Sequence, residues 1–313
     1  MQATRRPVVD SLDRNKLHFV NINGIRTRYY EDGTGETLLL LCGGGIGSHY
    51  SLDGWSLNLP ELAKYFHVYA LDRLGQGHTD PPSDESDYTF DAVCKHTLAF
   101  IESLGLSQVN LVGHSSGAVL ATWIALEHTN LVKKLVLLDS ATLSPESPVF
   151  PVMDLVQKWN EDVPTWFYGF LPGSDGPFTR ENIRMEPDMQ AFYKEQVTDD
   201  YVDRLWEAAQ RPEHQVAHER MLRLSKTLDN PSRRRIKLEA HRTFEEEGLK
   251  VPTLVIWGLN DRGAPLPLGL ALFEKISLQT PHAELHVING AGHNCYRDQP
   301  EAFSRILKSF CLG

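Results

Sequence analysis

Short apolar runs recur along the chain, each bounded by polar or glycine-rich residues. A run without polar alternation suits a strand that is buried on both faces, as in a parallel sheet. Six such runs lie at 38–41, 67–71, 109–112, 135–138, 253–257 and 284–288. Apolar residues at helical spacing fill 90–103 and 118–128, so strands and helices alternate. This alternation predicts an α/β protein with a mostly parallel sheet and right-handed crossovers.

Two further strands are predicted at 18–23 and 25–30, with Asn23-Gly24 as a hairpin signal between them. They bring the predicted sheet to eight strands. The alternation then breaks between Asp139 and Val251, a stretch far longer than an ordinary loop. Within it, 195–210 and 214–226 have amphipathic helical patterns. We expect a core of 1–140 and 251–313, with helices on both faces of the sheet, and a helical cap of 141–250 inserted after the sixth strand.

A strand, a tight turn and a helix meet at Gly113-His114-Ser115-Ser116-Gly117. The pentapeptide G-x-S-x-G is common by chance, but a buried strand runs into it and a helix follows at once. The two glycines allow a sharp turn that lifts a serine hydroxyl above the strand ends. The motif therefore predicts Ser115 as a catalytic nucleophile, the alternative being a plain strand-to-helix connector.

A serine hydroxyl is a poor nucleophile near neutral pH and needs a base. His293 follows the last predicted strand directly, and Asp261 follows the strand before it. Loops at the carboxyl ends of parallel strands are where α/β sites are built. The chain order Ser115, Asp261, His293 is also the order that α/β-hydrolases use. We expect His293 as the base and Asp261 as its acid, with Asp139 as the rival acid.

The glycine run after the third strand, Cys42-Gly43-Gly44-Gly45, predicts an oxyanion hole. Glycines let backbone N–H groups reach a developing oxyanion without a side chain in the way. We expect the amide of Gly44 or Gly45 to act with that of Ser116. The alternative is a dinucleotide-binding loop, but Ser48 stands where its last glycine would be.

Together these residues resemble the α/β-hydrolase superfamily over nearly the whole chain, including the turn at 71–80 after the fourth strand. Within it, the glycine loop, the serine turn and the segment 204–214 are similar to the meta-cleavage product hydrolases. The resemblance implies hydrolysis of a C–C bond in a ring-fission dienoate or related 1,5-diketone. It also implies that Arg204 binds the substrate carboxylate, as a guanidinium does bidentately. The alternative is a surface arginine paired with Asp200 or Glu207.

Three positions depart from the family pattern. Cys42 stands where the family usually has His, His114 where it often has Asn, and Asn294 where it often has Trp. All three are expected near the acyl pocket, as substrate-binding positions. They leave the triad intact but open a second substrate class, namely an apolar ester or lactone cleaved by a carboxylesterase or lactonase.

Composition narrows the functional classes. The formal net charge is −10, which argues against nucleic-acid binding. His214 and His218 lie at i, i+4 but lack a third ligand, so no metal is expected. The four scattered cysteines suggest neither a disulfide framework nor a zinc site, and most are expected to pack inertly. Neither a signal peptide nor a spanning segment is visible, so we expect a soluble cytoplasmic enzyme without cofactor.

The expected partner is a small apolar carbonyl compound, and the oligomeric state stays open, a homo-oligomer being one option. An aromatic group at 159–170 is expected to pack between cap and sheet, with some members lining the substrate pocket. Two other hypotheses remain. One is a ligand-binding protein on a hydrolase scaffold, and the other is cofactor-free lyase or dioxygenase chemistry.

Overall fold

The computed structural model describes residue 10, residues 12–145 and residues 179–313. The aromatic group predicted at 159–170, and with it part of the predicted cap, lies outside the described residues. The description below concerns the described residues only.

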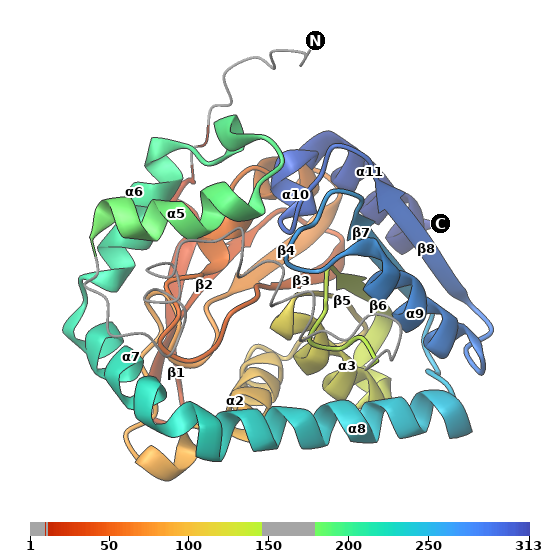
Figure 1. Cartoon of the computed structure of the whole chain (residues 1–313), viewed down its shortest axis with the longest axis horizontal. Coiled ribbons are helices and arrows are strands. Elements are labelled where there is room, and N and C mark those ends of the chain that lie inside the picture. The colour runs from red at the N-terminus through yellow and green to blue at the C-terminus, as the bar shows by residue number, and fades with distance from the viewer. Residues whose placement is uncertain (1–9, 11, 146–178) are drawn as a thin grey trace.

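An eight-stranded sheet runs through the centre of the molecule (Figure 1). Its strands are β1 (Leu17–Ile22), β2 (Ile25–Asp32), β3 (Glu36–Leu41), β4 (Phe66–Leu71), β5 (Val109–His114), β6 (Val132–Leu138), β7 (Thr253–Gly258) and β8 (Ala283–Ile288). Their order across the sheet is β1-β2-β4-β3-β5-β6-β7-β8. β2 is antiparallel to both its neighbours, and the other pairs are parallel. The predicted α/β-hydrolase architecture is confirmed.

Helices lie on both faces of the sheet and at its edge. They are α1 (Leu59–Leu62), α2 (Phe90–Ser103), α3 (Ser116–Glu127), α5 (Arg180–Gln190), α6 (Asp199–Ala209), α7 (Pro212–Leu224), α8 (Asn230–Glu246), α9 (Leu266–Ser277), α10 (Cys295–Asp298) and α11 (Pro300–Leu312). A π-helical turn, η7 (Ser225–Asp229), joins α7 to α8. The short 3-10 helices are η1 (Arg14–Lys16), η2 (Leu52–Trp55), η3 (Glu85–Asp87), η4 (Thr129–Leu131) and η6 (Lys194–Gln196).

The apolar runs form strands because both of their faces are covered. Along β3, Leu39 and Leu41 belong to a cluster with residues of α2, α3, α8 and α9. Leu38 and Leu40 belong to a second cluster, on the other face, with residues of α1 and α11. All four leucines are fully buried. Burial of a leucine side chain stabilises a fold by about 1.5–3 kcal/mol, so this two-sided core holds the strand ends in place.

Between β6 and β7 the described residues form helices and no strand. Figure 1 shows α5, α6 and α7 following one another around one side of the sheet, and α8 running across its lower side. α5 and α6 share a small apolar cluster of their own, which includes Ile183, Tyr201 and Leu205. α8 packs instead against α2, α3 and α9 of the core. The segment predicted as cap therefore contains a helix that covers the sheet.

A buried arginine in β2 connects the core to the loop after β3. Arg28 contacts Asp53 of η2 at 2.5 Å and Asp72, at the end of β4, at 2.6 Å. Asp53 and Asp72 have no exposed side-chain surface. Two carboxylates at such depth need a cation beside them, because the interior does not solvate charge.

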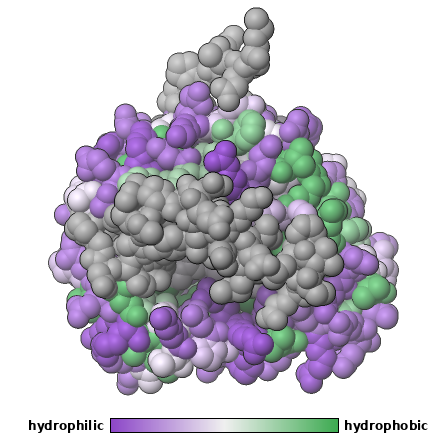
Figure 2. Space-filling model, in the orientation of Figure 1, coloured by the Kyte–Doolittle hydropathy of each residue, from purple (hydrophilic) through white to green (hydrophobic). Residues whose placement is uncertain are grey.

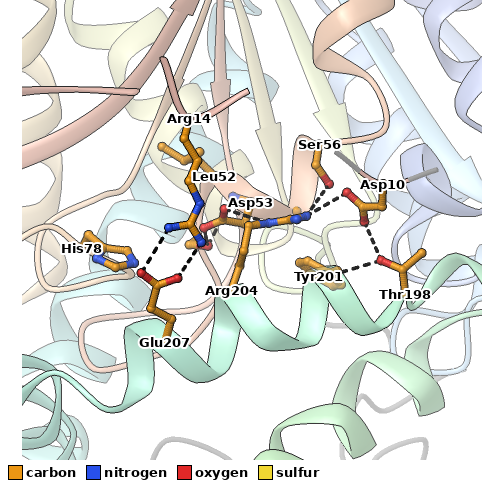
Figure 3. Close-up of polar contacts among 12 residues, drawn as sticks. Asp10, Arg14, Leu52, Asp53, Ser56, His78, Thr198, Tyr201, Arg204 and Glu207 are labelled. Carbon is orange, nitrogen blue, oxygen red and sulfur yellow. Dashed lines mark hydrogen bonds and ion pairs between the residues drawn. The ribbon is translucent and has the colours of Figure 1, made fainter. Parts of the chain in front are cut away.

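Arg204 of α6 extends this network to the cap. Its guanidinium lies 2.8 Å from Asp10 and 3.2 Å from Asp53, and Asp10 also pairs with Arg297 of α10 at 2.7 Å. Figure 3 shows the Arg204 side chain lying between these two carboxylates. α6 is thus tied to the N-terminal segment and to η2 by buried ion pairs.

Around the grey atoms in Figure 2, hydrophilic residues cover much of the surface, and hydrophobic residues gather mainly at the right. Exposed large hydrophobic residues are scattered over different elements, among them Phe19 of β1, Leu238 of α8 and Leu312 of α11. In the part of the chain that the structure describes, no helix is both long and apolar enough to cross a membrane.

Replacing Arg28 by alanine should lower the free energy of unfolding by about 3–5 kcal/mol, because it leaves Asp53 and Asp72 buried without this cation. Urea unfolding at pH 7 measures the change. Arg26→Ala is the matched control, since Arg26 lies in the same strand but is exposed over Phe19. Equal losses in the two variants would contradict the role given to the buried network.

Candidate active site

Ser115 lies at the tight turn between β5 and α3, with φ 52° and ψ −122°. A non-glycine residue at positive φ is strained and persists only where its surroundings enforce it. A Cβ on Gly113 would lie 2.4 Å from the Gly117 carbonyl, and one on Gly117 would lie 2.6 Å from the Cys42 carbonyl. Both glycines of the motif are therefore required by close packing, and the strand-turn-helix prediction is confirmed.

His293 and Asp261 come from neighbouring loops at the carboxyl ends of β8 and β7. The His293 Nδ1–H donates to Asp261 Oδ2 at 2.7 Å, and the other carboxylate oxygen accepts the amides of Gly263 and Ala264, each at 2.8 Å. The Asn260 amide also donates to the Ala291 carbonyl at 2.8 Å, which joins the two loops. Of the two acids that the sequence offered, Asp261 is the one that pairs with His293.

The surroundings of His293 favour its charged form. Burial opposes the charge, but the adjacent Asp261 carboxylate outweighs it and raises the pKa of His293 to about 9. Asp139, at the end of β6, accepts the Gly258 amide at 2.7 Å. Burial, together with the nearby charge of Asp261, raises the pKa of Asp139 well above its usual value. Asp139 therefore gives up its proton less readily than an ordinary aspartate.

The glycine loop lies directly against the nucleophile. A Cβ on Gly43 would lie 2.8 Å from the Ser115 Cβ and 3.4 Å from its Oγ, so no larger residue fits. A Cβ on Gly45, by contrast, would have no described atom of another residue beyond its chain neighbours within 4 Å. The Ser116 hydroxyl donates to the Gly44 carbonyl. The structure thus adds Gly43 to the residues beside Ser115, which the sequence did not single out.

A buried arginine holds this loop in shape. Arg73 donates to the carbonyls of Gly43 at 2.8 Å and Gly44 at 2.7 Å, and Gln76 donates to Gly43 at 2.8 Å. With these carbonyls occupied, the loop is fixed with its carbonyls turned toward Arg73. Sequence reasoning missed Arg73, although it stands inside the turn at 71–80 that carried part of the resemblance.

The comparisons with known proteins agree with this geometry. The model of the alpha/beta hydrolase fold family matches residues 37–300, more than half of the chain. The chain belongs to the α/β-hydrolase family. 2-Hydroxymuconate semialdehyde hydrolase of Pseudomonas sp. (strain CF600) is 29% identical over 287 residues, which cover 92% of this chain and 90% of that protein.

Two further comparisons show the same kinship. A 2-hydroxy-6-oxononadienedioate/2-hydroxy-6-oxononatrienedioate hydrolase of Pseudomonas putida is 30% identical over 301 residues, covering 91% of each chain. The solved structure of the meta-cleavage product hydrolase from Pseudomonas fluorescens IP01 aligns with a TM-score of 0.72 at 26% identity, covering 94% of this chain and 96% of that one. The predicted similarity of this α/β-hydrolase to the meta-cleavage product hydrolases is confirmed.

The three positions at which the sequence departs from those hydrolases all lie close to the site. The His114 Nε2–H donates to the His293 carbonyl at 2.9 Å, and burial holds the pKa of His114 well below its usual value, so it is neutral. Cys42 is buried 3.6 Å from Gln76 Oε1, and burial raises the pKa of its thiol to about 11. It is therefore a thiol and not a reactive thiolate. Asn294 Nδ2 donates to Gln190 Oε1 at 3.3 Å.

Arg204 has carboxylate partners other than those that the sequence suggested. Asp10 and Asp53 compensate its charge, whereas Glu207 pairs with Arg14. The guanidinium is about nine-tenths buried. A substrate carboxylate would have to compete with these two buried acids to reach it. The expected bidentate contact between Arg204 and a dienoate carboxylate would therefore require Arg204 to give up part of its pairing with Asp10 and Asp53.

The cap supplies a residue near the site that sequence reasoning missed. Glu186 of α5 is 7% exposed and lies 3.5 Å from His49. A signal was present, since Ile183, Glu186, Pro187 and Gln190 stand at i, i+3, i+4 and i+7, with a carboxylate on the buried stripe. Among the described residues, no group of three or more potential ligands could hold a metal ion, and this includes the neighbourhood of His214 and His218.

Replacing Asp261 by asparagine should lower the pKa of His293, because the variant removes the charge that stabilises the imidazolium. An NMR titration of the His293 ring measures it, and the wild-type midpoint should lie above 6.5. Glu284→Gln is the control. It removes a carboxylate that lies 3.4 Å from the exposed His286, and it should leave the pKa of His293 unchanged. An unshifted midpoint in Asp261→Asn would show that another acid, Asp139 first, governs His293.

Proposed function

We propose that the protein is a serine hydrolase in which Ser115 attacks a substrate carbonyl, His293 is the base and Asp261 orients it. The 2.7 Å contact between Asp261 and His293 carries the proposal, together with the strained turn at Ser115, whose neighbour His114 donates to the His293 carbonyl. In its neutral form, which predominates above its raised pKa of about 9, His293 donates Nδ1–H to Asp261 and presents Nε2 as the acceptor for the serine proton. This is the tautomer that a general base needs.

In the proposed reaction, Ser115 Oγ adds to the carbonyl carbon as its proton passes to His293. The oxyanion is held by the Ser116 amide at the N-terminus of α3 and by an amide of the glycine loop, Gly44 or Gly45, with Gly43 lining the approach. The tetrahedral species collapses as His293 returns the proton to the leaving group. Water then releases the acyl group, or water adds directly to give a gem-diol that collapses in the same way.

The bond that we propose first is a C–C bond beside a ketone in a 1,5-diketone or a ring-fission dienoate. This rests on the printed activities of the relatives, which are hydrolases of oxo-dienoate and semialdehyde compounds. A carbon leaving group departs readily only as an enol. The substrate must therefore first gain a proton on the dienol carbon. We expect His293 to transfer this proton from the dienol hydroxyl to the carbon.

The second candidate is a carboxylesterase or lactonase acting on an apolar, uncharged ester. The pairing of Arg204 with Asp10 and Asp53 favours it, since that pairing leaves Arg204 without spare charge for a substrate carboxylate. In either case the partner is a small apolar carbonyl compound. The two candidates share the triad and differ in how they hold the rest of the substrate.

Ser115→Ala should lower kcat by about 10⁴-fold or more on whichever substrate turns over, because the nucleophile is lost. We would measure p-nitrophenyl esters side by side with a 2-hydroxy-6-oxo-dienoate, following release of the phenolate and loss of the dienoate absorbance. Ser107→Ala is the control, since Ser107 is exposed before β5.

The two substrates separate the candidates. Preferred turnover of the dienoate supports C–C cleavage, and preferred turnover of the esters supports the second candidate. Multiple turnovers that persist in Ser115→Ala would refute the serine mechanism. Absence of any turnover on both substrates would favour a ligand-binding protein on this scaffold.

A further inference from the structure

The cap places a carboxyl group at the active site. Glu186 lies on the buried face of α5 and is 7% exposed. Its Oε1 accepts the Gln190 side-chain amide at 3.2 Å, and its Oε2 lies 3.5 Å from His49 Nε2. Burying a carboxyl is costly unless it is paired or neutral, so its position calls for an explanation in function or structure.

The helical turn that carries Glu186 touches both loops of the site. The Gln190 carbonyl accepts the His293 amide at 3.0 Å, which links α5 to the loop of the base. The Gln190 side chain accepts the Tyr50 hydroxyl at 2.7 Å, which links it to the segment that follows the glycine loop. The turn of Glu186 and Gln190 thus contacts both the loop that carries His293 and the segment that follows the glycine loop.

No arginine or lysine pairs with Glu186 among the described residues. Its partner His49 is neutral, because burial and the adjacent His214 and His218 lower the pKa of His49 to about 3. The cation that acts on Glu186 is His293, whose charge opposes the effect of burial on the Glu186 carboxyl. The negative charge of Glu186 therefore acts on the catalytic base as well as on Tyr50.

The nearby arginines are already compensated. Arg204 and Arg297 share Asp10, and Arg204 also faces Asp53. Arg73 holds the carbonyls of the glycine loop. A substrate with a carboxylate would meet Glu186 without an uncompensated arginine from this group to balance it.

We propose that Glu186 makes the site select substrates by their charge. The site then prefers uncharged carbonyl compounds over those that carry a carboxylate in their acyl part. The proposal rests on the serine mechanism above and narrows its substrate class. Through space, the same charge stabilises the protonated form of His293. Glu186 is therefore a specificity residue and, for the base, a positioning residue.

The preference should depend on pH in a definite direction. Burial raises the pKa of Glu186 to about 7, so the carboxyl is mostly neutral below that pH and mostly ionised above it. Repulsion of an anionic substrate therefore grows as the pH rises through 7. The groups that face Glu186 are His49, Tyr50 and His293. Those that face His293 from the core are Asp261, Asp139 and His114.

The test compares p-nitrophenyl pentanoate with mono-p-nitrophenyl glutarate. The two esters share a leaving group, and the acyl chain ends in a methyl group in the first and in a carboxylate in the second. In the wild type, kcat/KM should favour the pentanoate, and the ratio should rise between pH 6 and pH 8. Glu186→Gln should shrink the ratio at pH 8 by about tenfold or more, since two like charges within several ångström repel strongly in a partly buried site. Glu181→Gln, an exposed carboxyl on the same helix, is the control and should leave it unchanged.

A second readout separates charge from a merely structural role. Without the Glu186 charge the imidazolium is less stable, so the pKa of His293 falls. The acidic limb of kcat/KM on the pentanoate should move to lower pH in Glu186→Gln and stay in place in Glu181→Gln. A loss of stability alone would lower activity on both esters without moving this limb.

The outcomes are distinct. An unchanged ester ratio or an unmoved acidic limb in Glu186→Gln overturns the inference while leaving the serine mechanism intact. If Glu186→Gln does not fold, the wild-type ratio decides, and a ratio that stays flat between pH 6 and pH 8 overturns the inference. Absence of Ser115-dependent turnover on both esters and on the 2-hydroxy-6-oxo-dienoate overturns the proposed function itself.

Discussion

The ion pair between Asp261 and His293 is the interaction on which the site depends. It joins the loops after β7 and β8, and backbone bonds between the same loops fix its geometry. Both side chains are shielded from solvent, so their attraction is weakened little by water. The strained turn at Ser115 can serve catalysis only with this pair nearby, because a serine hydroxyl is a poor nucleophile without a base.

The buried arginines around the site are each paired with acceptors inside the protein. Arg28, Arg204 and Arg297 are matched by buried aspartates, and Arg73 is matched by backbone carbonyls. These contacts fix the cap helix α6 and the glycine loop relative to the sheet. They also mean that a substrate carboxylate would have to compete with buried aspartates for Arg204. The relatives' substrates, as their names print them, are oxo acids or semialdehydes of such acids.

Sequence reasoning reached the sheet, the turn at Ser115 and the order of the acid and base, because each has a local signal. Apolar runs report strands that are covered on both faces, and residues placed directly after strands share one sheet edge. The partners of Arg204 were beyond its reach, since Asp10 lies 194 positions away. Glu186 was missed because α5 carries many charged residues, and the sequence alone does not distinguish a buried carboxylate from the exposed ones beside it. The contact of Gly43 with Ser115 depends on loop geometry that no local pattern encodes.

The most direct test of the account is covalent labelling of the nucleophile. The protein would be incubated with diethyl p-nitrophenyl phosphate, digested and examined by mass spectrometry. We predict a single diethylphosphoryl group, carried by the peptide that contains Ser115, and a slower reaction when Asp261 is replaced by asparagine. A label on any other residue, or labelling of Ser115 at the same rate without the Asp261 charge, would contradict the account.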